Sequence, residues 1–274
     1  MSEKPLRPVG LIGGMSWQST QSYYARINQG ISARLGGNHS APLWMYSFDF
    51  AEIEALQETG QWKVAGQVMA DIARRLEDAG AQALLIATNT MHKMGDDVQN
   101  ATTIPLLHIV DATASAILAS EAQKSLLLAT RFTMTQDFYR APLGHILAND
   151  NRTVMVPPIA DQEKIHRIIY DELCRGIIGD DSRKIYQEII GRAATEFGCD
   201  SVILGCTEIG LLIGQHDTDL QVFDTTALHC DMALNFICSR RKGEAKEIAD
   251  PVLQYSLKMR RSWGAITLLD CINI

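Results

Sequence analysis

Two copies of one short sequence pattern carry the residues that could do chemistry. Residues 80–91 read GAQALLIATNTM and residues 198–209 read GCDSVILGCTEI, and they align without a gap so that Thr88 pairs with Cys206. In each copy a short apolar run ends in small and polar residues, which predicts a buried strand that delivers side chains at its carboxyl end. At such a position N–H groups and a helix N-terminus can lower the pKa of a thiol from about 8.5 towards neutrality, so Cys206 could act as a nucleophile or a base.

The surroundings of the two strand ends favour proton transfer at carbon over acyl transfer. A cysteine hydrolase needs a nearby histidine that a third group orients. Of the seven histidines only His92 lies close to either strand end, and it belongs to the Thr88 copy. Inverting a stereocentre needs one group to remove a proton from one face of the carbon and a second group to return it on the other face. Two quasi-equivalent strand ends supply such a pair.

The segments around these strand ends alternate between strand and helix patterns, twice over. Apolar runs at residues 9–12, 43–48, 83–86 and 105–110 predict strands of a first half, and the helix pattern at residues 62–79 ends at Gly80. A second half repeats this order, with strands predicted by the runs at residues 125–129, 155–158, 202–204 and 221–224. The glycine turn after the first strand lacks a GxGxxG pattern, which disfavours dinucleotide binding.

The repeat predicts an α/β protein with two pseudo-symmetric, Rossmann-like domains. Each has a parallel sheet flanked by helices, with the active site in the cleft between the domains. We expect residues 1–112 and 220–240 to form the first lobe and residues 113–219 the second. Residues 241–274 do not fit the repeat and form a C-terminal extension of unknown role.

Composition narrows the class of protein. The chain has 274 residues and a net charge of −7, which disfavours binding to nucleic acid or to an anionic membrane surface. No apolar stretch approaches the roughly 20 residues that span a bilayer, and residues 1–8 lack a signal-peptide pattern, so we expect a cytoplasmic protein. Six cysteines without CxxC spacing predict neither a disulfide framework nor a metal site. A small polar substrate is favoured.

Three sequence blocks resemble a known family. Residues 13–17 (GGMSW), 88–92 (TNTMH) and 205–208 (GCTE) are similar to the signature blocks of the cofactor-independent aspartate/glutamate racemases. They stand in that family's order and spacing, and the resemblance covers roughly residues 9 to 238. It implies an isomerase that acts on an acidic amino acid with two bases and needs no pyridoxal phosphate, metal or nucleotide. It also implies a homodimer.

The chain departs from the family pattern in one catalytic block. A typical aspartate racemase has Cys-Asn-Thr where this chain has Thr88-Asn89-Thr90, so only Cys206 keeps its thiol. A threonine hydroxyl holds its proton too tightly to be ionised at neutral pH, so it cannot serve as a base. It can, however, return a proton to a carbanion. We therefore expect Cys206 to abstract the α-proton and Thr88 to reprotonate slowly from the opposite face. Resemblance to the threonine-bearing branch of the family implies a preference for the L-enantiomer.

The remaining site residues are predicted to bind substrate through hydroxyl, amide and ammonium groups. These residues are Met15, Gln57, Asn89, Thr90, Thr130, Lys164 and Thr207. The resemblance assigns Lys164 to a substrate carboxylate. Residues 49–54 lack the arginine that such enzymes place after the second strand, and Gln57 is the candidate neutral substitute.

Several alternatives stay open at the level of sequence. His92 is better explained by packing or by a helix start than by acid chemistry. Glu208 could orient the thiol or cap the next helix, and capping is the commoner role. Within the superfamily, a hydantoin racemase, a maleate isomerase or an arylmalonate decarboxylase would use the same scaffold and cysteine. A non-catalytic amino-acid-binding module would use the same two lobes, and a cysteine hydrolase would form a covalent intermediate on Cys206.

Overall fold

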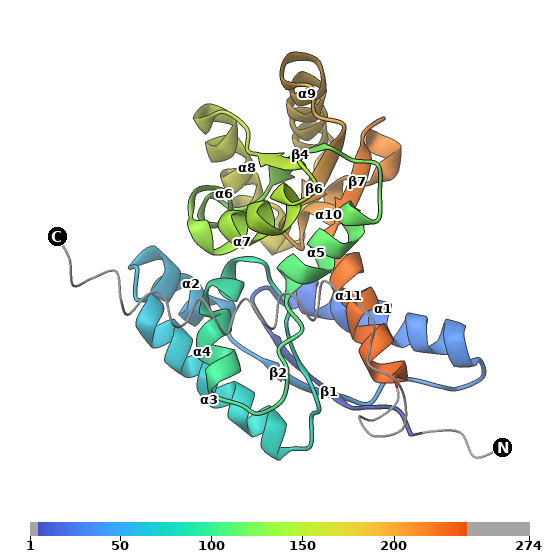
Figure 1. The fold of residues 1–274 in the computed structure, drawn as a ribbon. Coiled ribbons are helices and arrows are strands. Elements are labelled where there is room, and N and C mark those ends of the chain that lie inside the picture. Colours follow the sequence, from blue (N-terminus) through green and yellow to red (C-terminus); the bar gives the residue numbers. More distant parts are fainter. Residues whose placement is uncertain (1–4, 240–274) are drawn as a thin grey trace. The chain divides into compact units, whose positions relative to one another are not determined.

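Two parallel β-sheets organise residues 5–239, the part of the chain that the computed structural model describes (Figure 1). The first sheet has the strand order β2-β1-β3 and the second has the order β5-β4-β6-β7. Every strand pair in both sheets is parallel. The strands are β1 (Val9–Gly13), β2 (Leu43–Ser47), β3 (Leu84–Ile86), β4 (Lys124–Leu128), β5 (Thr153–Met155), β6 (Ser201–Leu204) and β7 (Gln221–Asp224). The predicted α/β class with two parallel sheets is confirmed.

Helices cover both faces of the first sheet. Its strands bury alternate side chains in two apolar clusters, with Ile12 of β1 in one and Leu11 in the other. Helix α3 packs on the Ile12 face, whereas α1 and α11 run side by side on the Leu11 face (Figure 1). Strands β1 and β3 are buried on both faces, which explains why they read as nearly continuous apolar runs, whereas the edge strand β2 is largely exposed. The helices of this half are α1 (Trp17–Leu35), α2 (Phe50–Glu58), α3 (Trp62–Asp78), the 3-10 helix η1 (Thr90–Met94), α4 (Gly95–Asn100) and α11 (Thr225–Cys238).

The second sheet lies in one large cluster of buried apolar side chains. Strands β4 and β6 contribute side chains to the centre of this cluster. Its helices and turns are α5 (Ile109–Leu118), α6 (Arg131–Thr135), α7 (Asp137–Ala148), α8 (Ile159–Asp171), η2 (Leu173–Arg175), α9 (Asp180–Phe197), α10 (Ile209–Leu212) and η3 (Gln215–Asp217). Glycines in left-handed conformations follow two of the long helices, Gly80 after α3 and Gly198 after α9. These are the glycines that open the two copies of the repeated pattern.

One predicted strand is wrong. The apolar run at residues 105–110 makes a single parallel bridge, between Leu106 and Leu84, and then enters helix α5 at Ile109. The helix begins this early because His108 caps it, with the side-chain Nδ1 accepting from the backbone N–H of Val110 at 3.2 Å. The corresponding run at residues 221–224 does form a strand, β7.

The chain passes from the second sheet back to the first half just after residue 220. Strand β7 pairs with β6 in the second sheet, whereas α11, which follows it, packs against α1. Residues 221–224 therefore lie in the second sheet, and the chain returns to the first half only at Thr225. The wider division at residues 112 and 219 stays a prediction, and the predicted extension at residues 241–274 lies outside the described residues.

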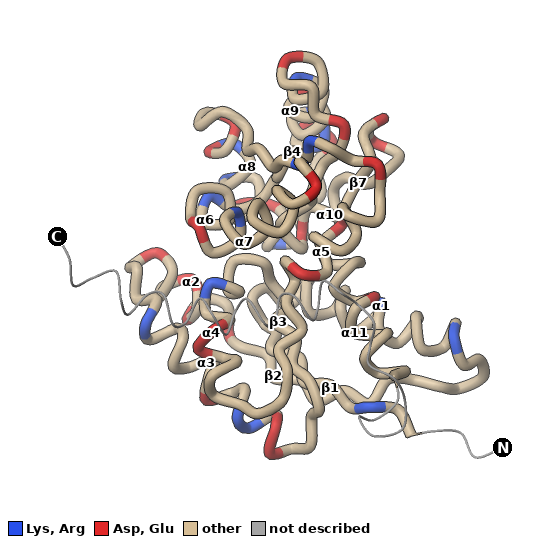
Figure 2. Tube along the Cα trace, in the orientation of Figure 1, with Lys and Arg blue, Asp and Glu red and all other residues tan. Residues whose placement is uncertain are grey.

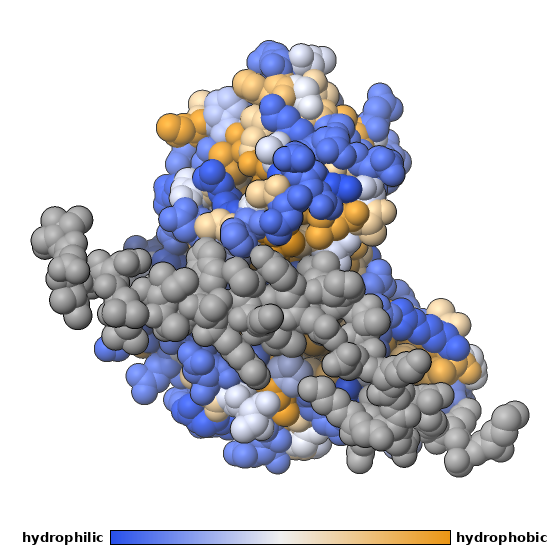
Figure 3. All heavy atoms as spheres, viewed as in Figure 1, coloured by the Kyte–Doolittle hydropathy of each residue, from blue (hydrophilic) through white to orange (hydrophobic). Residues whose placement is uncertain are grey.

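The surface of the described part is mixed in charge. Lys and Arg are interspersed with Asp and Glu on the outer helices, without a continuous basic band in this view (Figure 2). Hydrophilic residues cover most of the described surface seen in Figure 3, with small hydrophobic groups between them. No helix among residues 5–239 is long and apolar enough to cross a membrane.

Candidate active site

Thr88 and Cys206 occupy equivalent positions, each two residues after the end of a buried strand. Thr88 follows β3 of the first sheet, and Cys206 follows β6 of the second. Their exposed fractions are only 8% and 6%. Both side chains nevertheless line one small pocket, with an empty volume of about 270 Å³, part of it open to solvent. The structure thus brings the two ends of the sequence repeat to a single site, which we call the strand-end pocket.

The strand-end pocket is lined mainly by hydroxyl, thiol, amide and aromatic side chains. Its lining residues are Met15, Phe50, Gln57, Thr88, Thr90, Thr130, Ile169, Tyr170, Cys174, Cys206 and Glu208. Most of the residues predicted from the sequence are in this set. Glu208 is the one charged side chain among them.

At the first strand end, hydrogen bonds hold the backbone and the neighbouring side chains. The Thr88 carbonyl is 2.7 Å from His92 Nδ1, and the Asn89 amide donates to Thr225 Oγ1 at 3.1 Å. The hydroxyls of Thr90 and Thr130 are 2.9 Å apart and join the two halves of the pocket wall. Among residues 5–239, the Thr88 hydroxyl itself has no hydrogen-bonding partner. It is the group on this side that is left for a ligand.

At the second strand end, one buried carboxylate collects three donors. Glu208 Oε2 accepts from Cys206 Sγ at 3.0 Å and from the Thr207 hydroxyl at 2.7 Å, while Oε1 accepts from the Ser16 hydroxyl at 2.6 Å. The side chain makes no capping hydrogen bond to α10, which begins at the next residue. Of the two sequence interpretations of Glu208, the geometry therefore matches orientation of the thiol.

The surroundings of Cys206 raise the pKa of its thiol, whereas the sequence predicted that they would lower it. Burial, followed by the negative charge of Glu208, raises the pKa of the Cys206 thiol well above its usual range. The lowering expected from a strand end and nearby N–H groups is outweighed, because the thiol is removed from water and faces a carboxylate. In the resting site the sulfur is a thiol that donates to Glu208.

Aromatic and apolar side chains that the sequence analysis did not select close the pocket. Tyr170 of α8 donates its hydroxyl to Gln57 Oε1 at 2.9 Å and stacks against Phe50 of α2, with ring centroids 6.3 Å apart. Burial raises the pKa of the Tyr170 hydroxyl and of the Cys174 thiol. Tyr170 lies in α8 and Cys174 in the following 3-10 helix η2, so no helical spacing in the sequence marked the two as sharing a face.

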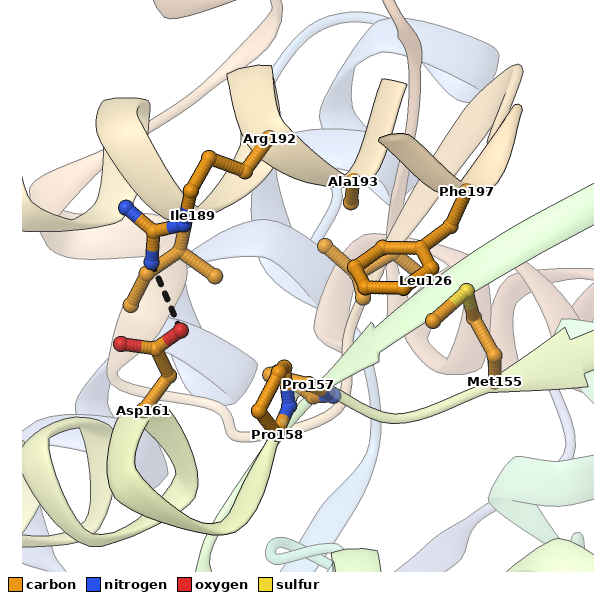
Figure 4. Close-up of a pocket in the computed structure, with 9 residues that line it drawn as sticks. All are labelled: Leu126, Met155, Pro157, Pro158, Asp161, Ile189, Arg192, Ala193 and Phe197. Carbon is orange, nitrogen blue, oxygen red and sulfur yellow. Dashed lines mark hydrogen bonds and ion pairs between the residues drawn. The ribbon is translucent and has the colours of Figure 1, made fainter. Parts of the chain in front are cut away.

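Three predicted substrate residues do not line the pocket. Asn89 and Thr207 are buried and face Thr225 and Glu208. The Lys164 ammonium, about half exposed, lies 3.4 Å from Asp161. Figure 4 shows Asp161 pointing towards Arg192 across a second, apolar pocket, with 2.6 Å between the paired atoms. This ion pairing holds Lys164 on the surface of α8.

Comparison with known proteins places the chain in a family. A model of the Asp/Glu/hydantoin racemase family matches residues 12–233. The chain belongs to this family. Its match to the broad specificity amino-acid racemase RacX of Bacillus subtilis (strain 168) has 23% identity and spans 57% of this chain and 65%, just under two thirds, of RacX.

Solved structures of the family share the fold. The chain is similar to a candidate Asp/Glu racemase from Yersinia pestis, with 46% identity and a TM-score of 0.78 over 85% of this chain and all of the other. It is also similar to an aspartate racemase homologue from Pyrococcus horikoshii OT3, with 34% identity and a TM-score of 0.71 over 86% of this chain and all of the other.

The strand-end pocket is asymmetric in what holds the side chains at its two strand ends. The thiol at one strand end is held directly by a carboxylate, whereas the hydroxyl at the other is free to meet a ligand. Among residues 5–239, no group of three or more His, Cys, Asp or Glu side chains is arranged to hold a metal ion.

Proposed function

We propose that this protein is a cofactor-independent amino-acid racemase in which Cys206 and Thr88 act on opposite faces of the α-carbon. One observation carries the proposal: the two side chains come from matching strand ends of two different sheets and line the same pocket. Membership of the racemase family supports it independently.

Cys206 removes the α-proton. As the sulfur approaches the α-carbon, the S–H proton passes to Glu208, which already accepts a hydrogen bond from the thiol at 3.0 Å. The sulfur lone pair then takes the α-hydrogen as a proton, and the C–H electron pair stays on the substrate as a carbanion. Glu208 is suited to this step because Ser16 and Thr207 hold its carboxylate in place.

Thr88 returns a proton to the other face. The carbanion takes the hydroxyl proton, and solvent later reprotonates the resulting alkoxide. A hydroxyl is a weak acid and a far weaker base, so the reverse abstraction by Thr88 is much slower than abstraction by Cys206. The enzyme is therefore slow and handed, with the L-enantiomer as the preferred substrate by resemblance to the threonine-bearing branch.

Aspartate and glutamate are the proposed substrates. The family resemblance and the similarity to the candidate Asp/Glu racemase of Yersinia pestis and the aspartate racemase homologue of Pyrococcus horikoshii support an acidic amino acid. The hydroxyls of Thr90 and Thr130 and the amide of Gln57 are the neutral groups on the pocket wall that would hold its polar atoms. Lys164 would join them by leaving Asp161 for a substrate carboxylate.

The test is α-hydrogen exchange in heavy water, measured by NMR on L- and D-aspartate, L- and D-glutamate and a panel of neutral amino acids. We expect exchange from an L-enantiomer that Cys206→Ala abolishes. Cys199→Ala is the matched control, because Cys199 is a buried cysteine at the start of the same pattern and lies outside the pocket. Thr88→Cys should add turnover of the D-enantiomer. D-substrate turnover that stays undetectable in this variant would contradict the one-sided model.

A non-catalytic amino-acid-binding module is the second candidate. Two observations favour it: a threonine stands where a second thiol would be, and the pKa of Cys206 is raised. It predicts saturable binding of an amino acid by calorimetry without Cys206-dependent exchange.

A further inference from the structure

The ring of His92 is fixed behind the first strand end by two hydrogen bonds. Its Nδ1 lies 2.7 Å from the carbonyl oxygen of Thr88, and its Nε2 accepts from the backbone N–H of Ile109 at 3.3 Å. Because the N–H of Ile109 can only donate, Nε2 carries no hydrogen in this arrangement. The hydrogen of the neutral ring is therefore on Nδ1, and His92 donates it to Thr88.

Neighbouring rings keep His92 in this orientation. It is only 3% exposed, and its ring centroid lies 4.5 Å from that of His108 and 5.5 Å from that of His229, both edge to face. The side chain does not line the strand-end pocket, whereas Thr88 does. His92 thus lies behind the pocket wall and contacts the backbone of the residue that carries the hydroxyl.

The second copy of the repeat has no equivalent group. In the gapless alignment His92 pairs with Gly210, and a Cβ there would lie 3.2 Å from an oxygen of the Asp224 side chain. At that end Glu208 holds the reactive sulfur directly. The two strand ends therefore use different devices, a side-chain acceptor for Cys206 and a backbone anchor for Thr88.

We infer that His92 is the positioning residue for proton return, holding the Thr88 hydroxyl against the substrate through the Thr88 carbonyl. The inference rests on the proposed racemase function. A β-branched side chain has few rotamers, so the place of the hydroxyl follows the place of the backbone. No hydrogen bond within the described residues holds the hydroxyl itself. A donor this weak is sensitive to distance, because a misplacement of about 1 Å can cost about 100-fold in rate.

Two amide variants of the full-length protein separate the hydrogen bond from the bulk of the ring. In His92→Asn the amide nitrogen takes the place of Nδ1 and can still donate to Thr88. In His92→Gln it takes the place of Nε2 and cannot. Two rates are measured for each: α-hydrogen exchange from the L-enantiomer, which needs Cys206, and formation of the D-enantiomer, which also needs Thr88.

We expect His92→Gln to lower the ratio of racemisation to exchange by at least about tenfold, and His92→Asn to keep it within about threefold. An unchanged ratio in His92→Gln would overturn the inference. So would equal losses of both rates together with a lower melting temperature, since that is the result of a merely structural role.

A measurement on the wild-type protein covers the case in which the variants fail to fold. The ¹⁵N chemical shifts of the ring should place the hydrogen of His92 on Nδ1, and a hydrogen on Nε2 would overturn the inference. Absence of Cys206-dependent exchange in the wild type would instead refute the proposed function. The ¹⁵N shifts would still test whether His92 donates a hydrogen bond to the Thr88 carbonyl.

Discussion

At the scale of single residues, we expect the negative charge of Glu208, added to burial, to make the Cys206 thiol less acidic. The carboxylate is the second cause, after burial, of the raised pKa of the thiol. Glu208→Gln removes the charge and keeps one of the two oxygens, which can still accept either from Ser16 or from Cys206 and Thr207. We expect the pKa of Cys206 to fall, so that the midpoint of the pH profile for alkylation by iodoacetamide moves to lower pH.

Glu54→Gln is the matched control for this experiment, because the charge of Glu54 acts on Cys174 and not on Cys206. The modified cysteine is identified by mass spectrometry. A profile for Cys206 that is the same in Glu208→Gln and in the wild type would show that burial alone raises the pKa. Racemisation should nevertheless fall in Glu208→Gln, because the amide cannot take the thiol proton.

The sequence predicted that Thr88 and Cys206 share one site, but it did not predict the contacts that surround them. Aligning the two copies was sufficient to pair Thr88 with Cys206 and to predict that both reach one pocket. The direction of the Cys206 pKa was wrong, because it depends on how deeply the fold buries the thiol and on where the carboxylate of Glu208 points. The Ser16 hydroxyl that holds this carboxylate comes from 192 positions away in the chain. No local pattern contains that contact.

At the scale of elements, the turn between β1 and α1 tolerates no side chain at Gly14. This residue has a φ of +83°, and a Cβ would lie 2.2 Å from backbone atoms of Phe48. Gly36 has a similar φ of +75°, but nothing lies within 4 Å of its Cβ position. At Gly36, where ψ is −176°, alanine would bring backbone strain of about 1–3 kcal/mol without a clash, whereas alanine at Gly14 would add a clash with backbone atoms to the strain of a positive φ.

We therefore expect Gly14→Ala to lower the free energy of unfolding by more than about 3 kcal/mol and Gly36→Ala by about 1–3 kcal/mol, measured by urea denaturation. Gly14→Ala should also lower exchange activity, because the same turn carries Met15 and Ser16 to the pocket. Equal losses in the two variants would mean that the turn relaxes around the new methyl group.

The pattern of apolar residues predicted the strands and helices, except where a capping side chain began a helix inside an apolar run. The parallel sheets and the glycines after α3 and α9 were predicted from apolar runs and glycine positions. The run at residues 105–110 looked like a strand, but the His108 cap converts its second part into α5. Apolar content does not distinguish a buried strand from the first turn of a buried helix.

At the scale of the whole molecule, contacts between the two halves define the pocket, and the sequence did not predict them. Thr90 meets Thr130, and Tyr170 meets Gln57. The repeat predicted that both halves would contribute strand ends. It could not predict which helix faces meet, because that depends on side-chain packing rather than on the order of elements. Phe50 and Tyr170 were missed for this reason.

His229 links three segments in the first half, and its protonation should weaken the whole fold. The ring lies 2.8 Å from the Tyr23 hydroxyl of α1 and 2.7 Å from the Leu107 carbonyl oxygen. The carbonyl can only accept, so Nε2 carries the hydrogen and Nδ1 accepts from Tyr23. Burial lowers the pKa of His229 from 6.5 to about 4. A second ring proton on Nδ1 would reverse this contact, so that the Tyr23 hydroxyl would have to accept instead of donate.

Between pH 6.5 and 4 the unfolded chain therefore binds a proton at His229 that the folded chain does not. Stability falls as the pH falls through this window, by up to about 3 kcal/mol from this residue. In His229→Gln the amide can still donate to Leu107, but nothing titrates at this position. We expect this variant to be less stable than the wild type at pH 7 and to lose less stability between pH 6.5 and 4, as measured by urea denaturation at each pH. Parallel pH profiles for the two proteins would show that acid acts on the fold through other groups.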